Sequence, residues 1–231
     1  AAPIKDMQFV LHELTELRTV QQLPGGEEAT DDTVQAVLEE AARFLGEVVA
    51  PLNRAGDTQP ARWKDGAGAT SPGFRDAFNA FVAAGWQGLQ HPSEFGGQGM
   101  PKVVCAPFLE MLQAANLSFA LCPLLTDGAI EALLVAGSDA QKATYLPPLI
   151  EGRWTGTMNL TEAQAGSDLS QVRTRAVPQG DGTYRLTGEK IFITYGEHDL
   201  AENIIHLVLA RTPDAPEGVK GISLFLVPKF L

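Results

Sequence analysis

The sequence contains little cysteine. Its two cysteines, Cys105 and Cys122, are too few to build the disulfide framework of a small extracellular fold. Both stand in stretches with helical periodicity, and free cysteines are usually buried among core side chains. We therefore expect both to be core residues of a protein from a reducing compartment.

Positive charge is scarce as well. The chain has 17 Lys and Arg residues against 28 Asp and Glu residues, which gives a net charge of -11. Nucleic-acid binding needs clustered basic residues that neutralise phosphates, and an anionic membrane surface repels an acidic protein. The composition therefore predicts a protein without a nucleic-acid partner.

The chain also lacks a long uninterrupted hydrophobic run. Residues 204–210 form an apolar stretch that His206 interrupts, and it is far shorter than the roughly 20 residues of a membrane-spanning helix. The first residues do not have the pattern of a signal peptide. These features predict no membrane insertion and a cytoplasmic location, while a hydrophobic content of 45% predicts a packed core.

Helical periodicity dominates the first two thirds of the chain. Apolar residues recur at three- and four-residue steps over residues 7–17, before the helix-breaking segment LPGGEE. Thr30 is placed to cap a second helix, and Ser71 with Pro72 to begin a third that ends at Gly85. Further helices are predicted over 102–117, 126–136 and 138–150, the last with Ser138 as its cap.

Proline and glycine predict where this helical pattern is interrupted. Pro51 is expected to end or kink the second helix. Residues 53–73 are rich in Gly, Pro, Asp and Arg, so they are expected to form a long surface loop. Pro147 and Pro148 are expected to end the last helix of the series.

Beyond Gly152 the pattern becomes alternating or β-branched, which is typical of strands. Helices followed by strands predict an α+β fold, an N-terminal all-α domain followed by an antiparallel β domain. The predicted division is an N-terminal helical extension over 1–30, an α-helical domain over 31–152 and a β domain over 153–231. The strands are expected in RWTGTMNL (153–160), VRTRAV (172–177), GTYRLTGEKIFITYG (182–196), NIIHLVLART (203–212) and GISLFLVPKF (221–230).

Two possible ligand motifs do not hold up. EFGGQGMPK lacks the third glycine and the strand, turn and helix context of a dinucleotide-binding fingerprint. The polar group formed by Glu197, His198, Asp199, Glu202 and His206 contains no His pair at the spacing of a helical metal site. We interpret it as a solvated turn and predict no metal ligand.

The segment TEAQAGSD is the stronger candidate. Thr161 offers a hydroxyl at a strand end, Gly166 lets a backbone approach a ligand closely, and Ser167 can bind a phosphate oxygen. Such a turn suits an anionic, planar ligand, although an ordinary capped turn at Ser167 explains the same residues. In GEKIFITYG, Phe192 and Thr194 lie two residues apart and are expected to share one face of a strand.

The segments PSEFGGQGMP, GTMNLTEAQAGSD and TGEKIFIT occur in the order and at the spacing seen in the acyl-CoA dehydrogenases, and the chain resembles this family along essentially its whole length. The extra N-terminal helix and the segment over 206–230 resemble the family's larger subgroup, which includes bacterial long-chain enzymes. The resemblance implies an α-helical domain, a β domain and a C-terminal helical bundle. In this chain the β domain is expected to be incomplete and the C-terminal bundle to be missing.

The resemblance also implies FAD as the cofactor. The reaction implied is the dehydrogenation of an acyl-CoA to a trans-2-enoyl-CoA, with hydride transfer to flavin N5, where Thr194 would donate a hydrogen bond. Ser167 would also contact the acyl-CoA. The residues implied to bind FAD are Met158, Leu160 and Thr161 along the isoalloxazine, Gly166 and Ser167 near the pyrophosphate, and Phe192, Ile193 and Thr194 along the flavin wall.

The partners that the resemblance implies are an acyl-CoA substrate, an electron-transferring flavoprotein, and identical subunits in a homodimer or homotetramer, in the cytoplasm of a bacterium. The family's catalytic base is a glutamate of the C-terminal bundle, so we expect no catalytic residue in this chain. Glu162 is expected to brace its turn. Two alternatives stay open, a non-catalytic acyl-CoA or protein-binding module and an acyl-CoA oxidase.

One departure from the family pattern concerns the turn. Ala163 and Gln164 stand where the family usually has proline and often glycine after the Thr-Glu pair. Proline would restrict the backbone of this turn, so its loss predicts a less rigid turn.

Overall fold

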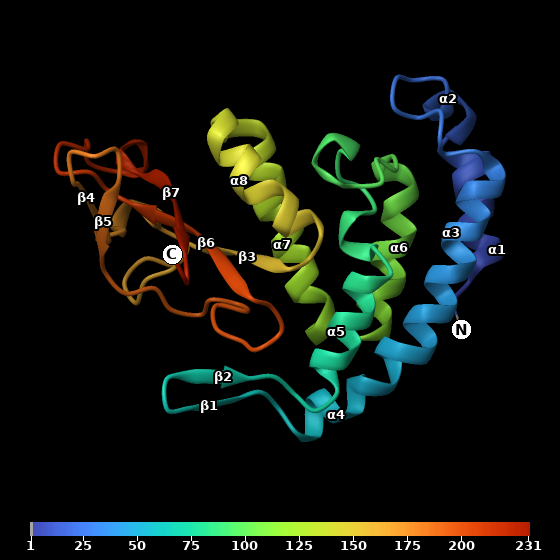
Figure 1. Cartoon of the computed structure of the whole chain (residues 1–231), viewed down its shortest axis with the longest axis horizontal. Helices are drawn as coiled ribbons and strands as arrows, with labels where there is room; N and C mark the ends of the chain where they lie inside the picture. Colours follow the sequence, from blue (N-terminus) through green and yellow to red (C-terminus); the bar gives the residue numbers. More distant parts are fainter. Residues whose placement is uncertain (1) are drawn as a thin grey trace.

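The computed structural model describes residues 2–231. Helices gather on one side of the molecule and strands on the other (Figure 1), which confirms the predicted α+β class with a helical domain followed by a β domain. The helices are α1 (Ile4–Phe9), α2 (Leu17–Gln21), α3 (Asp31–Phe44), α4 (Asn53–Thr58), α5 (Phe74–Ala83), α6 (Lys102–Ala115), α7 (Leu117–Ala136) and α8 (Asp139–Ile150). The strands are β1 (Arg62–Lys64), β2 (Ala67–Ala69), β3 (Trp154–Asn159), β4 (Arg175–Pro178), β5 (Tyr184–Thr187), β6 (Asn203–Ala210) and β7 (Ser223–Pro228).

The N-terminal segment is not the single helix predicted over residues 7–17. α1 continues into a π-helical turn over Val10–Leu14, and Glu16 then takes a left-handed conformation with φ 51° before α2 begins. Met7 and Leu17 are nevertheless buried in the same core cluster. The apolar spacing was therefore correct, whereas the break at Glu16 is a backbone feature that hydrophobic periodicity does not reveal.

α3 begins at its predicted cap. The Thr33 N–H donates to the Thr30 hydroxyl, which satisfies one of the free donors of the first helical turn. At its other end, α3 runs into a π-helical turn over Leu45–Val49 and a 3-10 turn that contains Pro51. Pro51 therefore kinks the helical path rather than ending it, because α4 follows directly.

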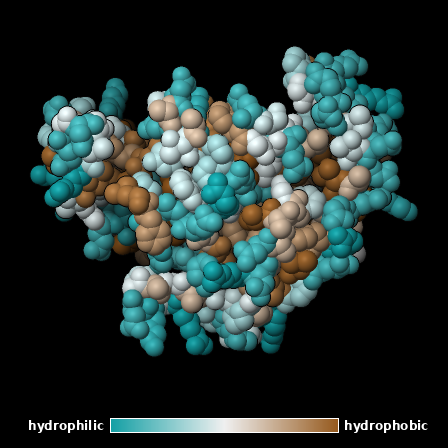
Figure 2. Space-filling model, in the orientation of Figure 1, coloured by the Kyte–Doolittle hydropathy of each residue, from teal (hydrophilic) through white to brown (hydrophobic). Residues whose placement is uncertain are grey.

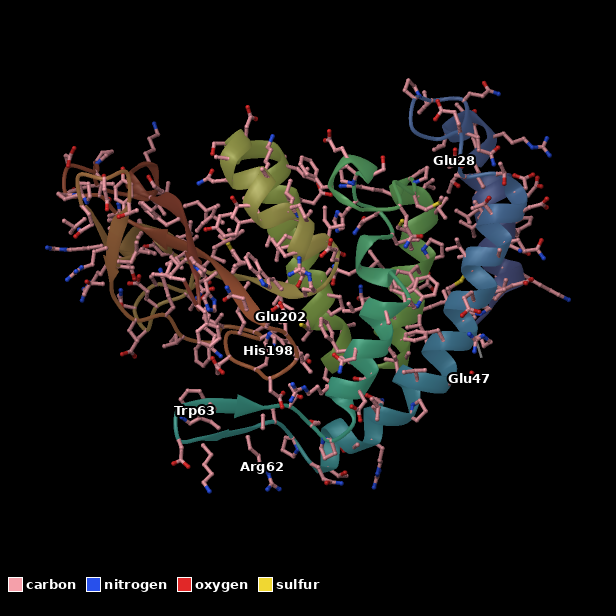
Figure 3. The ribbon with its side chains drawn as sticks, in the orientation of Figure 1. Glu28, Glu47, Arg62, Trp63, His198 and Glu202 are labelled. Carbon is pink, nitrogen blue, oxygen red and sulfur yellow. The ribbon has the colours of Figure 1, made fainter. Side chains whose placement is uncertain are left out.

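Residues 53–73 form ordered structure rather than the predicted loop. They contain α4 and the antiparallel hairpin of β1 and β2. Asp65 and Gly66 connect the two strands with positive φ angles of 52° and 83°, conformations that an Asp-Gly pair favours in a tight hairpin turn. The hairpin extends away from the helices and exposes Trp63 (Figure 3). The Asp65-Gly66 pair was a hairpin signal in the sequence, but the polar composition around it led to the prediction of a loop.

α7 is longer than predicted, whereas α8 has the predicted cap and the predicted end at residue 150. α7 starts well before residue 126, because the side chain of Asn116 caps it. α8 has the predicted cap Ser138, but it continues through Pro147 and Pro148, so the prediction that these prolines end it is wrong. Proline lacks an N–H donor, yet its carbonyl still accepts, and here the Glu151 N–H donates to the Pro147 carbonyl.

α7 is the one helix in the described part of the chain that is long and apolar enough to cross a membrane, judged by length and composition only. It contains Asp127, which accepts hydrogen bonds from Gln87 and Gln90, and it packs against α6, α8 and β3. A helix in the core of a globular protein has the same composition. Counting uninterrupted apolar runs did not single out this helix.

The helical domain has an aromatic core. Phe78, Phe81 and Phe119 are almost fully buried and pack ring against ring. Cys105 and Cys122 are buried in the same cluster, which confirms the predicted core position of both. Burial raises the pKa of both thiols, that of Cys105 to about 12, so neither is a thiolate at neutral pH.

On the face shown in Figure 2, hydrophilic residues cover most of the rim and hydrophobic residues show mainly inside it.

The sheet of the β domain is mixed rather than wholly antiparallel. β6 is its central strand, paired parallel with β3 and antiparallel with β7. β4 and β5 form a separate antiparallel hairpin. Backbone hydrogen bonds of Arg211 with Thr174 and Ala176 attach this hairpin to the end of β6.

β3 lies directly against α7 (Figure 1). The Gly156 N–H donates to the Thr126 hydroxyl at 3.1 Å, and a Cβ at Gly156 would come within 2.4 Å of the Ala129 Cβ. Only glycine permits so close an approach of strand and helix. Because β3 leads into residues 160–168, this contact fixes where that segment begins relative to the helical domain.

Candidate functional site

The polar turn after β3 is short and closed. Glu162 and Ala165 exchange backbone hydrogen bonds of 3.1 and 3.0 Å, and Ala165 is fully buried. Gly166 and Ser167 follow on the exposed side. The turn therefore has a fixed inner side and an open outer side that carries the glycine and the hydroxyl.

Glu162 holds this turn from the inside. Its carboxylate accepts hydrogen bonds from the backbone N–H groups of Arg173 and Thr174, the Thr174 hydroxyl, Gln164 Nε2 and Lys190 Nζ. Burial alone would raise the pKa of Glu162, but these donors outweigh burial and lower the pKa to about 2. A carboxylate with so low a pKa is a poor proton acceptor, which agrees with the expected role of Glu162 as a brace.

The segment after β5 is a loop rather than a continuation of the strand predicted over 182–196. Phe192 has a positive φ of 58°, and the loop is tied to the first motif because the Ile191 N–H donates to the Thr161 carbonyl at 3.0 Å. The expectation that Phe192 and Thr194 share a strand face is therefore wrong. The hydrogen bonds of this segment run to the neighbouring motif instead of to a strand ladder.

The structure brings the two groups of predicted cofactor-binding residues together. The link between Ile191 and Thr161 is one contact, and the bond from Lys190 Nζ to the Leu160 carbonyl at 2.9 Å is another. The roles of these residues toward a cofactor stay predictions. Met158, Leu160, Thr161 and Ile193 are partly buried, whereas Gly166, Ser167, Phe192 and Thr194 are exposed.

The outer side of the turn has the donors that an anionic ligand needs. In the part of the chain that the structure describes, the backbone N–H groups of Gly166, Ser167 and Asp168 donate to no protein acceptor. A Cβ at Gly166 would meet nothing within 4 Å, so the space above it is open. Free N–H groups in a turn bind phosphate oxygens, and these residues fit the pyrophosphate of FAD.

Phe192 provides an apolar surface on the loop that is bonded to this turn. Its side chain is 88% exposed, although an aromatic ring of this kind is normally buried or in contact with a partner. Its positive φ holds the ring in a conformation that a non-glycine residue adopts at some cost. An exposed ring in a strained conformation is typical of a ligand-binding wall, and it fits the planar isoalloxazine.

A pocket beside Thr194 was not predicted. It has a volume of about 300 Å³ and lies between α5, α7 and the loop that follows Thr194, with Phe74, Ser118 and Leu121 among its lining residues. The Tyr195 hydroxyl donates to the Ser118 carbonyl at 2.6 Å and ties this loop to the start of α7. Residues so far apart in the sequence carried no common signal before the fold was known.

The interpretation of residues 197–206 as a solvated turn is wrong for His198. His198 is 4% exposed and lies in the loop above the hairpin (Figure 3). Its Nδ1 accepts from the Leu200 N–H and its Nε2 contacts the Thr155 hydroxyl at 3.0 Å. Burial lowers the pKa of His198 to about 4, so it is neutral at physiological pH and helps to fix the loop to β3. Among residues 2–231, no three His, Cys, Asp or Glu side chains form a group that could hold a metal ion.

Comparison with known families gives a consistent assignment. Residues 31–153 match the acyl-CoA dehydrogenase N-terminal domain, and residues 157–230 match the acyl-CoA dehydrogenase middle domain. The chain belongs to the acyl-CoA dehydrogenase family, whose members are FAD-dependent flavoprotein enzymes. The predicted boundaries at residues 30 and 152 remain predictions.

Several relatives carry more specific names. The chain is 58% identical over 230 residues to the 3-methylmercaptopropionyl-CoA dehydrogenase of Ruegeria pomeroyi, which covers 100% of the chain and 39% of the relative. It is 39% identical over 203 residues to a butyryl-CoA dehydrogenase of Syntrophomonas wolfei, covering 86% of the chain and 33% of the relative. The chain thus spans about two fifths or less of the length of these relatives.

Solved structures show the same fold. The butyryl-CoA dehydrogenase from Megasphaera elsdenii aligns with a TM-score of 0.71 at 28% identity, over 87% of this chain and 49% of that one. A chain from a study of the electron transferring flavoprotein of Acidaminococcus fermentans aligns with a TM-score of 0.71 at 30% identity, over the same shares of the two chains.

Glu162 predicts a pH dependence of stability. Because its pKa in the folded protein, about 2, is below the ordinary 4.5, the carboxylate stabilises the fold above pH 4.5, and this contribution is lost as the pH falls toward 2. The lowered pKa of Glu162 corresponds to a contribution on the order of 3 kcal/mol to the free energy of unfolding at neutral pH. Urea unfolding at pH 7 and pH 3 is expected to show about 2 kcal/mol of this loss, because pH 3 is still above the folded pKa, and Glu162→Gln is expected to remove it. The exposed Glu28→Gln control is expected to behave like the unchanged protein, and equal pH dependence in both variants would contradict the assignment.

Proposed function

We propose that this chain is part of a FAD-dependent acyl-CoA dehydrogenase that removes hydrogen from the α and β carbons of an acyl-CoA thioester and releases a trans-2-enoyl-CoA. The observation that carries the proposal is the meeting of two segments, the turn over 160–168 and the loop over 188–194. These two bonded segments carry free N–H groups, an exposed aromatic ring and two exposed hydroxyls. Family membership and the names of the relatives support the same activity.

Each residue of this site has a definite task in the proposal. The N–H groups of Gly166 and Ser167 bind the pyrophosphate of FAD, and the Ser167 hydroxyl contacts the acyl-CoA. Phe192 covers the isoalloxazine, with Met158, Leu160, Thr161 and Ile193 along its edge, while the Thr194 hydroxyl donates a hydrogen bond to flavin N5. When bound, the flavin supplies the hydride acceptor of the reaction.

The proton of the α carbon needs a different acceptor. Glu162 is unsuited to this task, because its pKa is lowered to about 2 and its oxygens are occupied by donors. We expect the base to come from outside residues 1–231, and no residue of this chain is assigned to proton removal.

The setting of the enzyme is part of the same proposal. An electron-transferring flavoprotein would take the electrons, in keeping with the fold similarity to a chain from a study of such a protein. The enzyme would act in fatty-acid β-oxidation or a related pathway, as a homodimer or homotetramer in a bacterial cytoplasm. The bacterial sources of two named relatives are in keeping with a bacterial enzyme.

Anaerobic mixing of the full-length holoprotein with acyl-CoAs tests the proposal, because a dehydrogenase bleaches its flavin in a single turnover. Thr194→Val is expected to fold, since valine resembles threonine in shape and residue 194 is exposed. It is expected to slow bleaching about fivefold, the equivalent of one net hydrogen bond. The exposed substitution Thr183→Val is expected to leave the rate unchanged.

The outcomes separate the alternatives. No bleaching with any acyl-CoA by a flavin-loaded protein would favour a non-catalytic binding module. Stoichiometric hydrogen peroxide under air would favour an oxidase. Equal bleaching rates for Thr194→Val and the unchanged protein would show that the Thr194 hydroxyl does not contact the flavin.

A further inference from the structure

We propose that Glu162, Lys190 and Gln164 form a clamp that sets the spacing between the turn over 160–168 and the loop over 188–194, and that Glu162 and Lys190 are thereby positioning residues for the cofactor. This inference rests on the proposed function, because the two segments are those assigned to FAD. It adds residues whose side chains bond the turn and the loop to one another.

The centre of the clamp is a buried ion pair. Lys190 Nζ lies 2.8 Å from Glu162 Oε1, and the two side chains are 8% and 4% exposed. Lys190 also donates to the Leu160 carbonyl at 2.9 Å. One ammonium group of the loop is thus bonded to both the side chain and the backbone of the turn, and it lies where water screens the attraction little.

The two oxygens of Glu162 divide the remaining contacts. Oε1, which binds Lys190, also accepts from the Thr174 N–H at 3.0 Å and from the Thr174 hydroxyl. Oε2 accepts from the Arg173 N–H at 2.7 Å and from Gln164 Nε2 at 2.6 Å. The carboxylate therefore joins the turn, the approach to β4 and the loop at a single point.

Gln164 gives the turn a rigidity that its sequence does not suggest. Besides Glu162, its amide donates to the Gln171 carbonyl at 3.1 Å. These two bonds hold both ends of the segment 162–171 to one side chain. The expected loss of rigidity from the missing proline is therefore offset by side-chain hydrogen bonds.

The clamp has a positional effect because other links between the two segments are few. In the described residues, the backbone bond from Ile191 to Thr161 is the other hydrogen bond that joins the loop to the turn. A buried ion pair is weak evidence for added stability, but it specifies one arrangement of the groups it joins. Without Lys190, the loop that carries Phe192 would keep a single hydrogen bond to the turn.

The experiment compares variants of the full-length protein stripped of flavin and titrated with FAD. Lys190→Met keeps the length of the side chain and removes its charge, and it is expected to weaken FAD binding at least about tenfold. Lys190→Arg is expected to restore part of the affinity. Lys102→Met is the matched control, because it removes the exposed Lys102–Glu131 pair of 3.0 Å in the helical domain, and it is expected to leave FAD affinity unchanged.

Hydrogen exchange separates positioning from general stability. In the flavin-free protein, Lys190→Met is expected to speed amide exchange over residues 188–194 while the helices of the α domain keep their protection. Gln164→Ala is expected to do the same over residues 162–171. Unchanged FAD affinity together with unchanged exchange in Lys190→Met would overturn the clamp, and equal acceleration over the whole chain would reduce it to a stabilising contact.

The same measurements keep this inference distinct from the proposed function. If the unchanged full-length protein takes up no FAD, the proposed function fails. The exchange data still decide whether the ion pair holds the two segments together. If FAD binds and bleaches normally in Lys190→Met and amide exchange over residues 188–194 is unchanged, the proposed function stands and the clamp fails.

Discussion

When residues 1–231 are produced alone, we expect them to reduce a dye acceptor with any acyl-CoA at least about a thousandfold more slowly than the full-length protein does. A proton beside a thioester leaves at a useful rate only when a base is positioned to accept it. Glu162 is occupied by donors, and Glu197, which lines the pocket beside Thr194, is paired with Lys229 at 2.8 Å. Anaerobic assays on acyl-CoAs of several chain lengths measure the effect.

The control for this prediction is the full-length protein assayed in the same way, with added FAD in both samples. Circular dichroism shows whether the shorter chain is folded before its activity is judged. Turnover by a folded sample with an intact mass of 24.7 kDa would contradict the prediction and place the base within these residues.

Gly156→Val is expected to destabilise the protein by about 3 kcal/mol. Strand propensity alone favours valine at this position, but a Cβ there would lie 2.4 Å from the Ala129 Cβ. The strand would have to move away from α7, and the Gly156 N–H would lose the Thr126 hydroxyl. Urea unfolding followed by circular dichroism measures the change in the free energy of unfolding.

Two further variants locate the cause. Gly46→Ala adds a methyl group where nothing lies within 4 Å, so it is expected to be neutral or slightly stabilising. Ala129→Gly in the Gly156→Val background is expected to recover part of the lost stability by removing the opposing methyl group. A Gly156→Val protein as stable as the parent would show that the strand and helix are not in tight contact.

Much of the helical domain could be predicted because its signals are local. Thr30 and Ser138 cap helices where the sequence placed them, since a cap depends on residues within one turn. Pro147 and Pro148 misled, because the loss of a donor in the last turn does not by itself end a helix. The start of α7 was missed because a helix buried in the core has weak amphipathic periodicity.

The β domain was less predictable because its pairing is not local. Residues 182–196 have strand composition throughout, yet the loop that carries Phe192 leaves the strand to contact Thr161. The parallel pairing of β3 with β6 depends on the long connection between the two strands. The composition of each strand alone does not indicate whether the pair is parallel or antiparallel. His198 looked solvated by its charged neighbours, whereas Thr155 and Leu200 bury it.

For the candidate site, the residues proposed to contact a ligand could be predicted from the sequence. The residues that hold them in place could not. Gly166, Ser167 and Thr194 were identified from residue type and from the family resemblance. Lys190 was not, because a lysine in a polar segment gives no sign of being 8% exposed beside a carboxylate. Supporting contacts of this kind join residues that only the folded chain brings together.

The parallel pairing of β3 with β6 also sets an order of events during synthesis. β3 leaves the ribosome soon after α8, but its partner β6 is made only after the turn, the β4–β5 hairpin and the loop have followed. At a synthesis rate of roughly 5 to 20 residues per second, β3 waits for seconds beside a helical domain that can already close its core. We therefore expect a nascent chain that is compact in its first half while its second half still lacks sheet structure. A ribosome stalled before β6 has emerged would hold such an intermediate, with its helices resistant to protease and the emerged residues beyond 154 open to cleavage.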